Sequence, residues 1–416
     1  MDASIICVGT ELLLGDVVNT NATYIAKELA QLGMNCFSQT VVGDNPQRLQ
    51  QMLAIENEKS DIIITTGGLG PTYDDLTKET IAKFFKRQLV LHEPSLQKIV
   101  DIFTKMNQQM TENNKKQAFV PDGATVLVND WGTAPGVILE VENKIIIMLP
   151  GPPRELKAMF EYRVKPYLQK LSETTLYSTN IHMFGVGESK LEDGLKNYME
   201  TMTNPTIAPY AKDGEVYLRV TASSIDAQSA RAQITPIVDK IATMYKKYIY
   251  GIDVDNMQTA FVQRLAAHKK TIAIAESCTG GRLMQLITEV PGCSEVFRGG
   301  ICAYDNNIKI NLLNIPKEII WANGAVAEKT ARYMARNIRE QLTADFGLAM
   351  TGILGPSGGT DEKPVGLMYI ALAQDSGEKV IKINLGRGYK NDRERIRYVA
   401  CLHAMNLTLQ ALESHN

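Results

Sequence analysis

The sequence has no long apolar run and no recognisable targeting segment. No stretch approaches the roughly 20 consecutive apolar residues that a membrane-spanning helix needs. The chain begins Met-Asp without a basic region, and Thr10 and Glu11 soon interrupt its apolar residues, so it does not resemble a signal peptide. We therefore expect no membrane segment and a cytoplasmic location.

Paired cysteines and an excess of positive charge are also missing. The six cysteines never form a C-x-x-C pair, which argues against a disulfide framework or a structural zinc site and indicates a reducing compartment. The 44 basic residues stand against 46 acidic ones, and the formal net charge is −2. Without a basic field, direct nucleic-acid binding is not expected.

The chain does contain enough apolar residues for several cores. Its 416 residues are 44% hydrophobic and 22% charged, which predicts two or three domains. Up to residue 170, short apolar runs alternate with helical patterns, which predicts an α/β domain with a mostly parallel sheet covered on both faces. Ligands of such sheets bind beyond the carboxyl ends of the strands. The predicted strands are residues 4–8, 36–42, 62–66 and 145–149.

Two further regions follow. Residues 177–251 read as β-α-β-β-α-β with a hairpin turn signal, and they offer no glycine-rich anion loop, so we expect a small structural α+β module there. A second α/β unit starts near residue 256. Its predicted strands are residues 271–275, 296–303, 346–350, 367–374 and 380–385. The predicted domains are residues 1–172, 173–254 and 255–416.

The stretch from Asp61 to Asp75 carries the clearest chemical signal. An apolar run enters a turn that is rich in glycine, and Asp74 and Asp75 follow where the next helix should begin. Glycines let backbone N–H groups approach an anion, and a helix N-terminus adds partial positive charge. The two carboxylates can hold a divalent cation against the same phosphate. The sequence therefore predicts a phosphate site with a bound metal.

Ser277 lies in a similar turn after the predicted strand 271–275, together with Gly280 and Gly281. A serine in this position can attack a carbonyl while converging N–H groups stabilise the oxyanion. The turn is not a G-x-S-x-G elbow. Capping of the following helix is the more common role of a serine at such a place, and both roles stay open.

A serine nucleophile needs a base, and none of the five histidines is an obvious partner. Lys309 follows the predicted strand 296–303, and a lysine kept neutral by burial can accept the proton. A lysine on a helix is more often solvated. A third glycine-rich turn, residues 351–359, suits either a phosphate or amide pocket or a plain connection.

Long motifs in both halves together resemble the competence/damage-inducible CinA family. The similarity covers nearly the whole chain in the family's order. In the first half the motifs are GTELLLG (9–15), NTN (19–21), VGDN (42–45), TGGLGPTYDDLT (66–77), Asn129 with GTAPG (132–136), and PGPPRE (150–155). In the second half they are ESCTGG (276–281) and TGILGP (351–356).

The resemblance implies a bifunctional enzyme of pyridine-nucleotide recycling. The C-terminal domain is similar to nicotinamide-nucleotide amidohydrolase, which converts nicotinamide mononucleotide to nicotinic acid mononucleotide and ammonia without a cofactor. The N-terminal domain is similar to the three-layer molybdopterin-binding fold, which this family associates with hydrolysis of ADP-ribose to AMP and ribose 5-phosphate using Mg, Mn or Co. By analogy we also expect a homodimer.

The resemblance also assigns residues in the N-terminal domain. Asp44 and Asp75 match acidic positions of the molybdopterin-binding relatives, and Asp75 is expected to bind metal or activate water. The expected metal ligands are Asp44, Asp74, Asp75 and Glu155. The expected phosphate contacts are Gly67, Gly68, Gly70 and Thr72.

In the C-terminal domain, Ser277 matches the family's nucleophile. Lys309 and Tyr304 are the expected proton-transfer partners, and Thr351 is the expected amide or oxyanion contact. Either Arg393 or Arg397 is expected to bind the nucleotide phosphate. The glycines expected to line this substrate site are Gly280, Gly281 and Gly352.

Two alternatives remain. The first is a non-catalytic binding role in competence or recombination, with a recombinase as partner, which the family's name suggests. The second is a molybdopterin-processing activity of the N-terminal half, which the fold similarity suggests, although a fold is weak evidence for a substrate.

Overall fold

The computed structural model describes residues 1–171, 175–386 and 392–413, and its contacts divide the chain into two compact units. One unit is Met1–Ser178 with Ala222–Gln233, and the other is Thr179–Thr221 with Ile234–Asn416. The predicted boundary between residues 172 and 173 lies outside the described residues, so the division into three domains stays a prediction. Among the described residues, no helix is both long and apolar enough to cross a bilayer.

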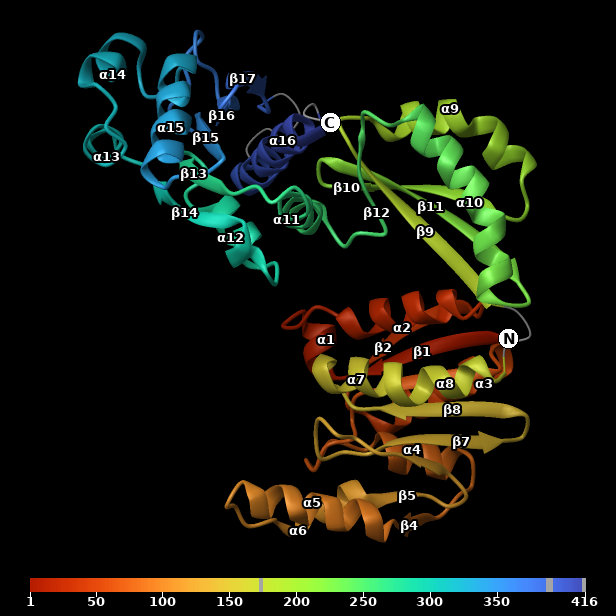
Figure 1. Cartoon of the computed structure of the whole chain (residues 1–416). Coiled ribbons are helices and arrows are strands. Elements are labelled where there is room, and N and C mark those ends of the chain that lie inside the picture. Colours follow the sequence, from red (N-terminus) through yellow and green to blue (C-terminus); the bar gives the residue numbers. More distant parts are fainter. Residues whose placement is uncertain (172–174, 387–391, 414–416) are drawn as a thin grey trace. The chain divides into compact units, whose positions relative to one another are not determined.

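The first unit contains a six-stranded sheet (Figure 1). Its strands are β1 Asp2–Val8, β2 Asn35–Val42, β3 Ile62–Thr66, β6 Thr125–Leu127, β7 Gly136–Val141 and β8 Lys144–Leu149. They lie in the order β2-β1-β3-β8-β7-β6. The first four strands of this order run parallel, whereas β7 and β6 join antiparallel. All four predicted strands of this domain are therefore present, and they are the parallel ones.

Helices cover both faces of this sheet, as the alternating pattern predicts. They are α1 Thr10–Leu14, α2 Thr20–Gln31, α3 Pro46–Lys59, α4 Thr77–Phe84, α5 Glu93–Lys105, α6 Glu112–Lys115, the single turns η1 Lys116–Ala118 and η2 Phe160–Val164, α7 Pro153–Met159 and α8 Lys165–Gln169. Successive strand residues point to opposite faces. Ile5 and Ile64 join the core with α2 and α7, whereas Ile6 and Ile63 join the core with α3 and α4. The domain is thus a three-layer α/β/α structure.

Between α4 and β6 the chain makes an excursion from this sheet. Strands β4 Leu89–Leu91 and β5 Phe119–Pro121 pair antiparallel as a separate two-stranded sheet. Helices α5 and α6 and the turn η1 lie between these two strands in the chain. This excursion, residues 89–121, was not predicted from the sequence.

The middle of the chain has the predicted order β-α-β-β-α-β. Its elements are β9 Thr175–Phe184, α9 Glu188–Thr201, β10 Thr206–Lys212, β11 Glu215–Ser224, α10 Ala227–Met244 and β12 Ile249–Ile252. The four strands form one sheet in the order β10-β11-β9-β12, and the hairpin β10–β11 turns at residues 213–214 as predicted.

The C-terminal part is a second α/β structure on a five-stranded sheet. Its strands are β13 Ile272–Glu276, β14 Phe297–Cys302, β15 Phe346–Gly352, β16 Leu367–Gln374 and β17 Gly377–Asn384. They lie in the order β14-β13-β15-β16-β17. Strands β14, β13 and β15 are parallel, and β16 and β17 are added antiparallel. The carboxyl ends of β13, β14 and β15 therefore meet at one edge.

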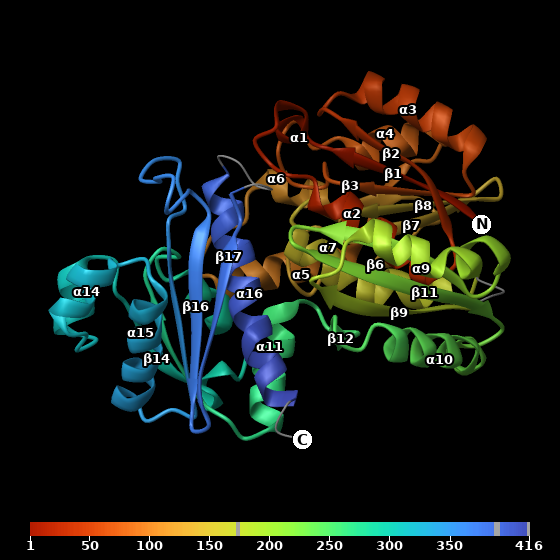
Figure 2. The same cartoon turned by 90° about the horizontal axis from the view of Figure 1, so that it is seen from above.

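Helices pack on both faces of this sheet as well (Figure 2). They are α11 Met257–Ala267, α12 Arg282–Thr288, η3 Cys293–Glu295, α13 Asn306–Asn311, α14 Lys317–Asn323, α15 Glu328–Gln341 and α16 Arg393–Glu413. Ile272 and Ile274 join the core with α11, α12 and α16. Ala273 and Ala275 face the core with α15, where small side chains let the helix lie close to the sheet.

Candidate functional site

Backbone hydrogen bonds join the segments that follow the parallel strands of the first sheet. Gly9 N, after β1, donates to Val42 O of β2 at 2.9 Å, and Gly67 N, after β3, donates to Leu149 O of β8 at 3.0 Å. The side chain of Asn21 donates to Gly151 O at 2.7 Å. The segments after these four strands therefore gather at one edge of the sheet, as expected for a ligand site of this fold.

The glycine-rich loop after β3 runs into what we call the acidic turn, residues 70–76. Thr77 closes the loop, because its hydroxyl donates to Gly67 O at 3.0 Å and its N–H donates to Gly68 O at 3.1 Å. A β-carbon at Gly70 would collide with the carboxylate of Asp75. Glycine at position 70 is thus required for the side chain of Asp75 to fold back over the turn.

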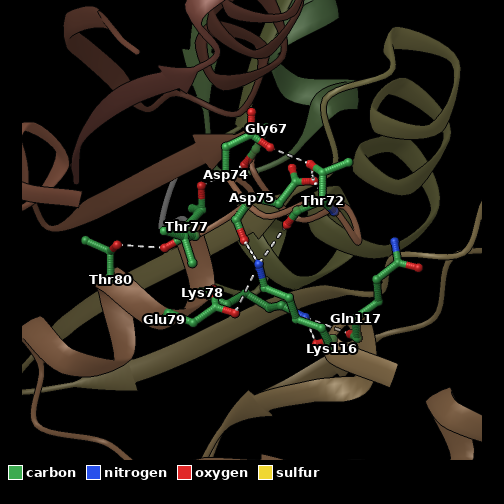
Figure 3. A network of polar contacts seen from close by, with 11 residues as sticks. Gly67, Thr72, Asp74, Asp75, Thr77, Lys78, Glu79, Thr80, Lys116 and Gln117 are labelled. Atoms are coloured by element: carbon green, nitrogen blue, oxygen red, sulfur yellow. Dashed lines mark hydrogen bonds and ion pairs between the residues drawn. The ribbon is translucent and has the colours of Figure 1, made fainter. Parts of the chain in front are cut away.

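The two aspartates of the acidic turn converge on Thr72 (Figure 3). The Thr72 hydroxyl lies 2.7 Å from Asp74 Oδ1 and also bonds to Asp75 Oδ2, which accepts the Thr72 N–H at 2.9 Å. The hydrogen bond from Thr72 holds the pKa of Asp74 below its usual value, so this exposed carboxylate is ionised. Two carboxylates therefore share one small turn beside the glycine-rich loop.

The other two predicted metal ligands are held elsewhere at this edge. Asp44 Oδ2 accepts the N–H and the hydroxyl of Thr10, each at 2.8 Å. Glu155 accepts a hydrogen bond from Asn129 at 2.7 Å, and burial raises its pKa. Over the described residues, no group of three or more His, Cys, Asp or Glu side chains is arranged to hold a metal ion. The predicted four-carboxylate set is thus not preassembled.

The donor set nevertheless fits a magnesium-type cation. Mg²⁺ is usually held by one or two carboxylates, with waters and substrate phosphates as the remaining ligands. Asp74 and Asp75 supply two carboxylates beside a loop whose backbone suits phosphate. The metal itself stays a prediction.

Two lysines that the sequence analysis did not single out contact the acidic turn or its neighbours. Lys116 Nζ donates to Thr72 O at 3.0 Å and to Asp75 O, and Lys78 Nζ donates to Gln117 O at 2.6 Å. Burial lowers the pKa of Lys78 to about 8. No local sequence pattern could reveal them, because their partners lie 39 to 44 residues away along the chain.

Ser277 follows the carboxyl end of β13 in the C-terminal sheet. Its N–H donates to Met350 O at 3.0 Å, which continues the pairing of β13 with β15, and the residue is buried. The N-cap of α12 is Gly281, without a side-chain cap hydrogen bond. Helix capping, the common role of a serine at such a turn, is therefore not the role of Ser277.

A buried glutamate completes this turn. Glu276 Oε2 accepts the N–H of Gly281 at 3.0 Å, and its Oε1 accepts the N–H of Met284 at 2.8 Å. The N–H of Gly280 donates to Ser277 O at 3.2 Å. Both glycine N–H groups are thus engaged within the turn, so the predicted contact of Gly280 and Gly281 with substrate stays a prediction and would require these bonds to open. Glu276 is the first residue of the ESCTGG motif (276–281), and the sequence predicted no role for it.

Lys309 is buried against the same edge of the sheet, with only 1% of its surface exposed. Its Nζ donates to Ala303 O at 2.6 Å and to Tyr304 O at 3.1 Å. Ala303 in turn donates its N–H to Glu276 O at 2.7 Å, which brings the amine beside the Ser277 turn. Burial lowers the pKa of Lys309, so the solvated surface lysine that is commoner on helices is not what the fold produces.

Three further predicted residues, Tyr304, Arg393 and Arg397, lie around the Ser277 turn and make different contacts. Tyr304 is exposed, its hydroxyl accepts a hydrogen bond from Arg393 at 3.2 Å, and Arg393 also donates to Gly355 O at 2.5 Å. Arg397 instead donates from Nε and Nη2 to Thr279 O, at 3.0 and 2.7 Å. The two arginines thus differ: Arg397 braces the Ser277 turn, whereas Arg393 joins the exposed tyrosine to the third glycine-rich loop.

Thr351 and Gly352 end β15, next to the strand that leads to Ser277. Thr351 is fully buried, and its hydroxyl donates to Ala325 O at 2.8 Å. Gly352 pairs with Met368 of β16. The fold therefore brings Ser277, Lys309 and Thr351 to one edge, with the Thr351 hydroxyl already bonded to the backbone.

Comparison with known proteins connects these sites to described families. Residues 254–412 match the CinA C-terminal domain, residues 4–170 match the probable molybdopterin binding domain, and residues 178–251 match the damage-inducible protein CinA KH domain.

Full-length relatives match the whole chain. A CinA-like protein of Kosmotoga olearia is 48% identical over 412 residues, covering 99% of each chain. A putative competence-damage inducible protein of Clostridium acetobutylicum is 45% identical over 397 residues, covering 95% of this chain and 96% of its own. A crystal structure of CinA from Thermoplasma acidophilum, described as of unknown function, is 36% identical with a TM-score of 0.37, covering 40% of this chain and 96% of its own.

Proposed function

The chain belongs to the CinA family of competence/damage-inducible proteins, and from this premise we propose that it is a bifunctional enzyme of pyridine-nucleotide recycling. Its C-terminal domain is a serine amidase that converts nicotinamide mononucleotide to nicotinic acid mononucleotide and ammonia. Its N-terminal domain hydrolyses ADP-ribose to AMP and ribose 5-phosphate with a divalent cation. The cytoplasmic location, the homodimer and the domains 1–172, 173–254 and 255–416 belong to the same proposal.

One observation carries the amidase proposal: a buried amine and a buried serine at the same edge of the C-terminal sheet. Lys309 bonds to two backbone carbonyls, Ala303 O and Tyr304 O. A neutral amine has two N–H groups and one lone pair, so these two bonds use both donors and leave the lone pair as an acceptor. Burial favours the neutral form. Lys309 is therefore suited to act as the base for Ser277.

The reaction follows from these two groups. Ser277 Oγ attacks the carboxamide carbon, its proton passes to Lys309 Nζ, and a tetrahedral intermediate forms. Lys309 returns the proton to the leaving nitrogen, the C–N bond breaks, and ammonia departs from an acyl-enzyme. Water, deprotonated by the same amine, adds to the ester and releases the acid and Ser277.

Two arginines were candidates for the substrate phosphate, and their contacts favour Arg393. Arg397 uses two of its donor nitrogens on Thr279 O, which ties it to the turn. Arg393 hydrogen-bonds to Tyr304, whose side chain is exposed to solvent at this edge of the sheet. Guanidinium groups recognise phosphate through paired N–H donors. We therefore assign phosphate binding to Arg393 and positioning of the Ser277 turn to Arg397.

In the N-terminal domain, Asp74 and Asp75 would hold the cation, with Asp44 and Glu155 as further ligands through water or substrate. A bound divalent cation supplies charge stabilisation to the pyrophosphate and lowers the pKa of a coordinated water. Gly67, Gly68, Gly70 and Thr72 would hold the phosphate through the backbone of the loop, and for Gly67 and Thr72 this requires their N–H groups to leave Leu149 O and Asp75 Oδ2. Asp75 orients the attacking water.

A second candidate for the N-terminal half is molybdopterin processing, which the match of residues 4–170 to a probable molybdopterin binding domain favours. A non-catalytic role in competence is a third, since a relative is named a putative competence-damage inducible protein. Such a role would use a recombinase partner rather than direct nucleic-acid binding, given the net charge of −2.

A two-substrate assay on the full chain tests the proposal. Ammonia release from nicotinamide mononucleotide and AMP release from ADP-ribose are measured with and without EDTA. We expect both products without chelator, and loss of only AMP release with EDTA, because the amidase needs no metal. Absence of both activities would refute the proposal and favour the binding role. Adenylylation of molybdopterin without ADP-ribose cleavage would favour the second candidate.

A further inference from the structure

Two lysine side chains connect the region of the acidic turn to the excursion of residues 89–121 (Figure 3). Lys116 donates from the excursion to the acidic turn, and Lys78 donates from α4 to the excursion. Lys116 of η1 reaches the acidic turn. Its Nζ donates to Thr72 O at 3.0 Å and to Asp75 O, and it lies 3.7 Å from Glu79 Oε1. Two N–H donors of this ammonium thus meet backbone carbonyls of the acidic turn, and its charge lies near the Glu79 carboxylate, so Lys116 is tied to the turn.

Lys78 makes the reverse connection. It lies on α4, directly after the acidic turn, and its Nζ donates to Gln117 O at 2.6 Å and to Lys116 O at 3.4 Å. The backbone of η1 therefore accepts hydrogen bonds from Lys78 of α4, and the backbone of the acidic turn accepts hydrogen bonds from Lys116 of η1. Lys78 thus fixes η1, which carries Lys116, and Lys116 fixes the acidic turn, which directly precedes α4 and Lys78.

Burial of the Lys78 amine does not favour the stability of the fold. Lys78 is only 2% exposed, and burying an amine costs free energy that two backbone acceptors offset in part. A methionine of similar length would fill the same space without that cost. The fold therefore gains something from the Lys78 hydrogen bonds other than net stability. They fix the backbone of η1 at Lys116 and Gln117, and from this backbone the Lys116 side chain reaches Thr72 O and Asp75 O.

We propose that Lys78 and Lys116 are a reciprocal pair of positioning residues that hold the acidic turn in the geometry that receives the divalent cation. The inference rests on the proposed N-terminal activity and deepens it. Neither lysine touches the cation or the substrate. Both act through the backbone of the turn that carries Asp74 and Asp75, as outer hydrogen bonds orient metal ligands elsewhere.

The first test is amide hydrogen exchange of the full chain, followed over residues 68–80. The Thr72 N–H, bonded to Asp75 Oδ2, and the Asp75 N–H, bonded to Thr72 O, report the turn directly. We expect Lys116→Met and Lys78→Met each to speed their exchange by about tenfold. The matched control is Lys115→Met, which removes a partly exposed lysine whose Nζ bonds to Glu112, and it should leave the turn unchanged.

The second test is titration with Mn²⁺ alone, followed by electron paramagnetic resonance. We expect both lysine variants to weaken Mn²⁺ binding by about 10–100-fold, the usual effect of losing an outer partner of a metal ligand. Lys116→Arg should recover most of the affinity. The double variant should bind Mn²⁺ about as well as either single variant, because a reciprocal pair acts as one unit. Unfolding midpoints should stay within a few degrees of the wild type.

The results separate this inference from the proposed function. Wild-type exchange and Mn²⁺ affinity in Lys116→Met would overturn it, and so would equal losses in Lys115→Met or no Mn²⁺ binding by the wild type. If Lys78→Met fails to fold, Lys116→Met decides alone, because Lys116 is partly exposed. If wild-type protein binds Mn²⁺ but cleaves no ADP-ribose, the proposed activity fails while exchange and affinity still decide the role of the lysines.

Discussion

At the scale of single residues, both proposed sites involve a buried amine. Lys309 and Lys78 are 1% and 2% exposed, and burial lowers the pKa of each. The sequence singled out Lys309 by its place after a predicted strand and by the lack of a histidine partner for Ser277, but it could not show that Lys309 is buried, and it did not identify Lys78. Burial of a lysine is a property of the packing around it, so no local pattern distinguishes a buried lysine from a solvated one.

Replacement of Lys309 tests its role as a base. We expect Lys309→Met to lower the rate of ammonia release by about 10²–10⁴-fold, the usual contribution of a positioned general base, with little loss of stability. In the wild type the neutral amine is the active form, so the rate should rise with pH, with a midpoint below the usual lysine value of 10.5. A pH–rate profile of kcat measures this. An unchanged profile in Lys309→Met would show that another group takes the proton.

The buried amine of Lys78 should make the stability of the first unit depend on pH. Its pKa is about 8 in the folded chain and near 10.5 when unfolded, so the unfolded state binds more protons between these values. Stability should therefore rise from about pH 8 to 10.5, by up to ~1.4 kcal/mol per pH unit, relative to Lys78→Met.

Urea unfolding measures this difference. The chain has two tryptophans, Trp131 in the first unit and Trp321 in the second, so Trp321→Phe as the common background makes fluorescence report the first unit. A pH-independent difference between wild type and Lys78→Met would contradict the burial of a titrating amine.

At the scale of elements, short apolar runs were enough to predict the strands of the two α/β domains. The predicted strands 62–66 and 367–374 match β3 and β16, and the order β-α-β-β-α-β of the middle region is present. Strand order was not predicted for the C-terminal sheet, because it depends on pairings between distant segments. The excursion of residues 89–121 was missed for another reason: β4 and β5 have three residues each, too few to form a recognisable apolar run.

The same holds for the site residues: local sequence features were predicted, whereas contacts with distant residues were not. The turns that carry Asp74, Asp75 and Ser277 were found because glycine-rich turns after apolar runs are local features. The bonds that hold those turns were not found. Glu276 accepts the N–H groups of Gly281 and Met284 at the start of α12, and Arg397 reaches Thr279 from 118 residues away.

Close packing of α15 on the C-terminal sheet gives a prediction at this scale. A β-carbon at Gly347 of β15 would collide with Ala335 O of α15. Gly347→Ala should therefore destabilise the second unit by about 1–3 kcal/mol, as other overpacked cores do. Urea unfolding followed by Trp321 fluorescence measures the change. Gly187→Ala is the control, since a β-carbon there meets nothing within 4 Å, and a loss as large at Gly187 would contradict the packing argument.

At the scale of the whole molecule, charge and composition limit the partners. The net charge of −2 leaves no general field for polyanions, so the phosphates that bind should be those of small nucleotides held by local loops. The family's name alone suggests a direct link to DNA uptake.

Fluorescence anisotropy with a single-stranded oligonucleotide tests this point. At physiological salt we expect no binding below about 100 μM, the weak end of non-specific binding by basic proteins. Micromolar binding that weakens steeply with added salt would contradict the expectation and revive the binding role.

The central claim is that the chain carries two independent active sites, one in each α/β domain. Its most direct test measures ammonia release and AMP release on the same preparations of Ser277→Ala and Asp75→Ala. The account predicts that Ser277→Ala loses ammonia release by at least about 10³-fold and keeps AMP release, and that Asp75→Ala does the reverse. Equal loss of both activities in either variant, or full ammonia release by Ser277→Ala, would contradict it.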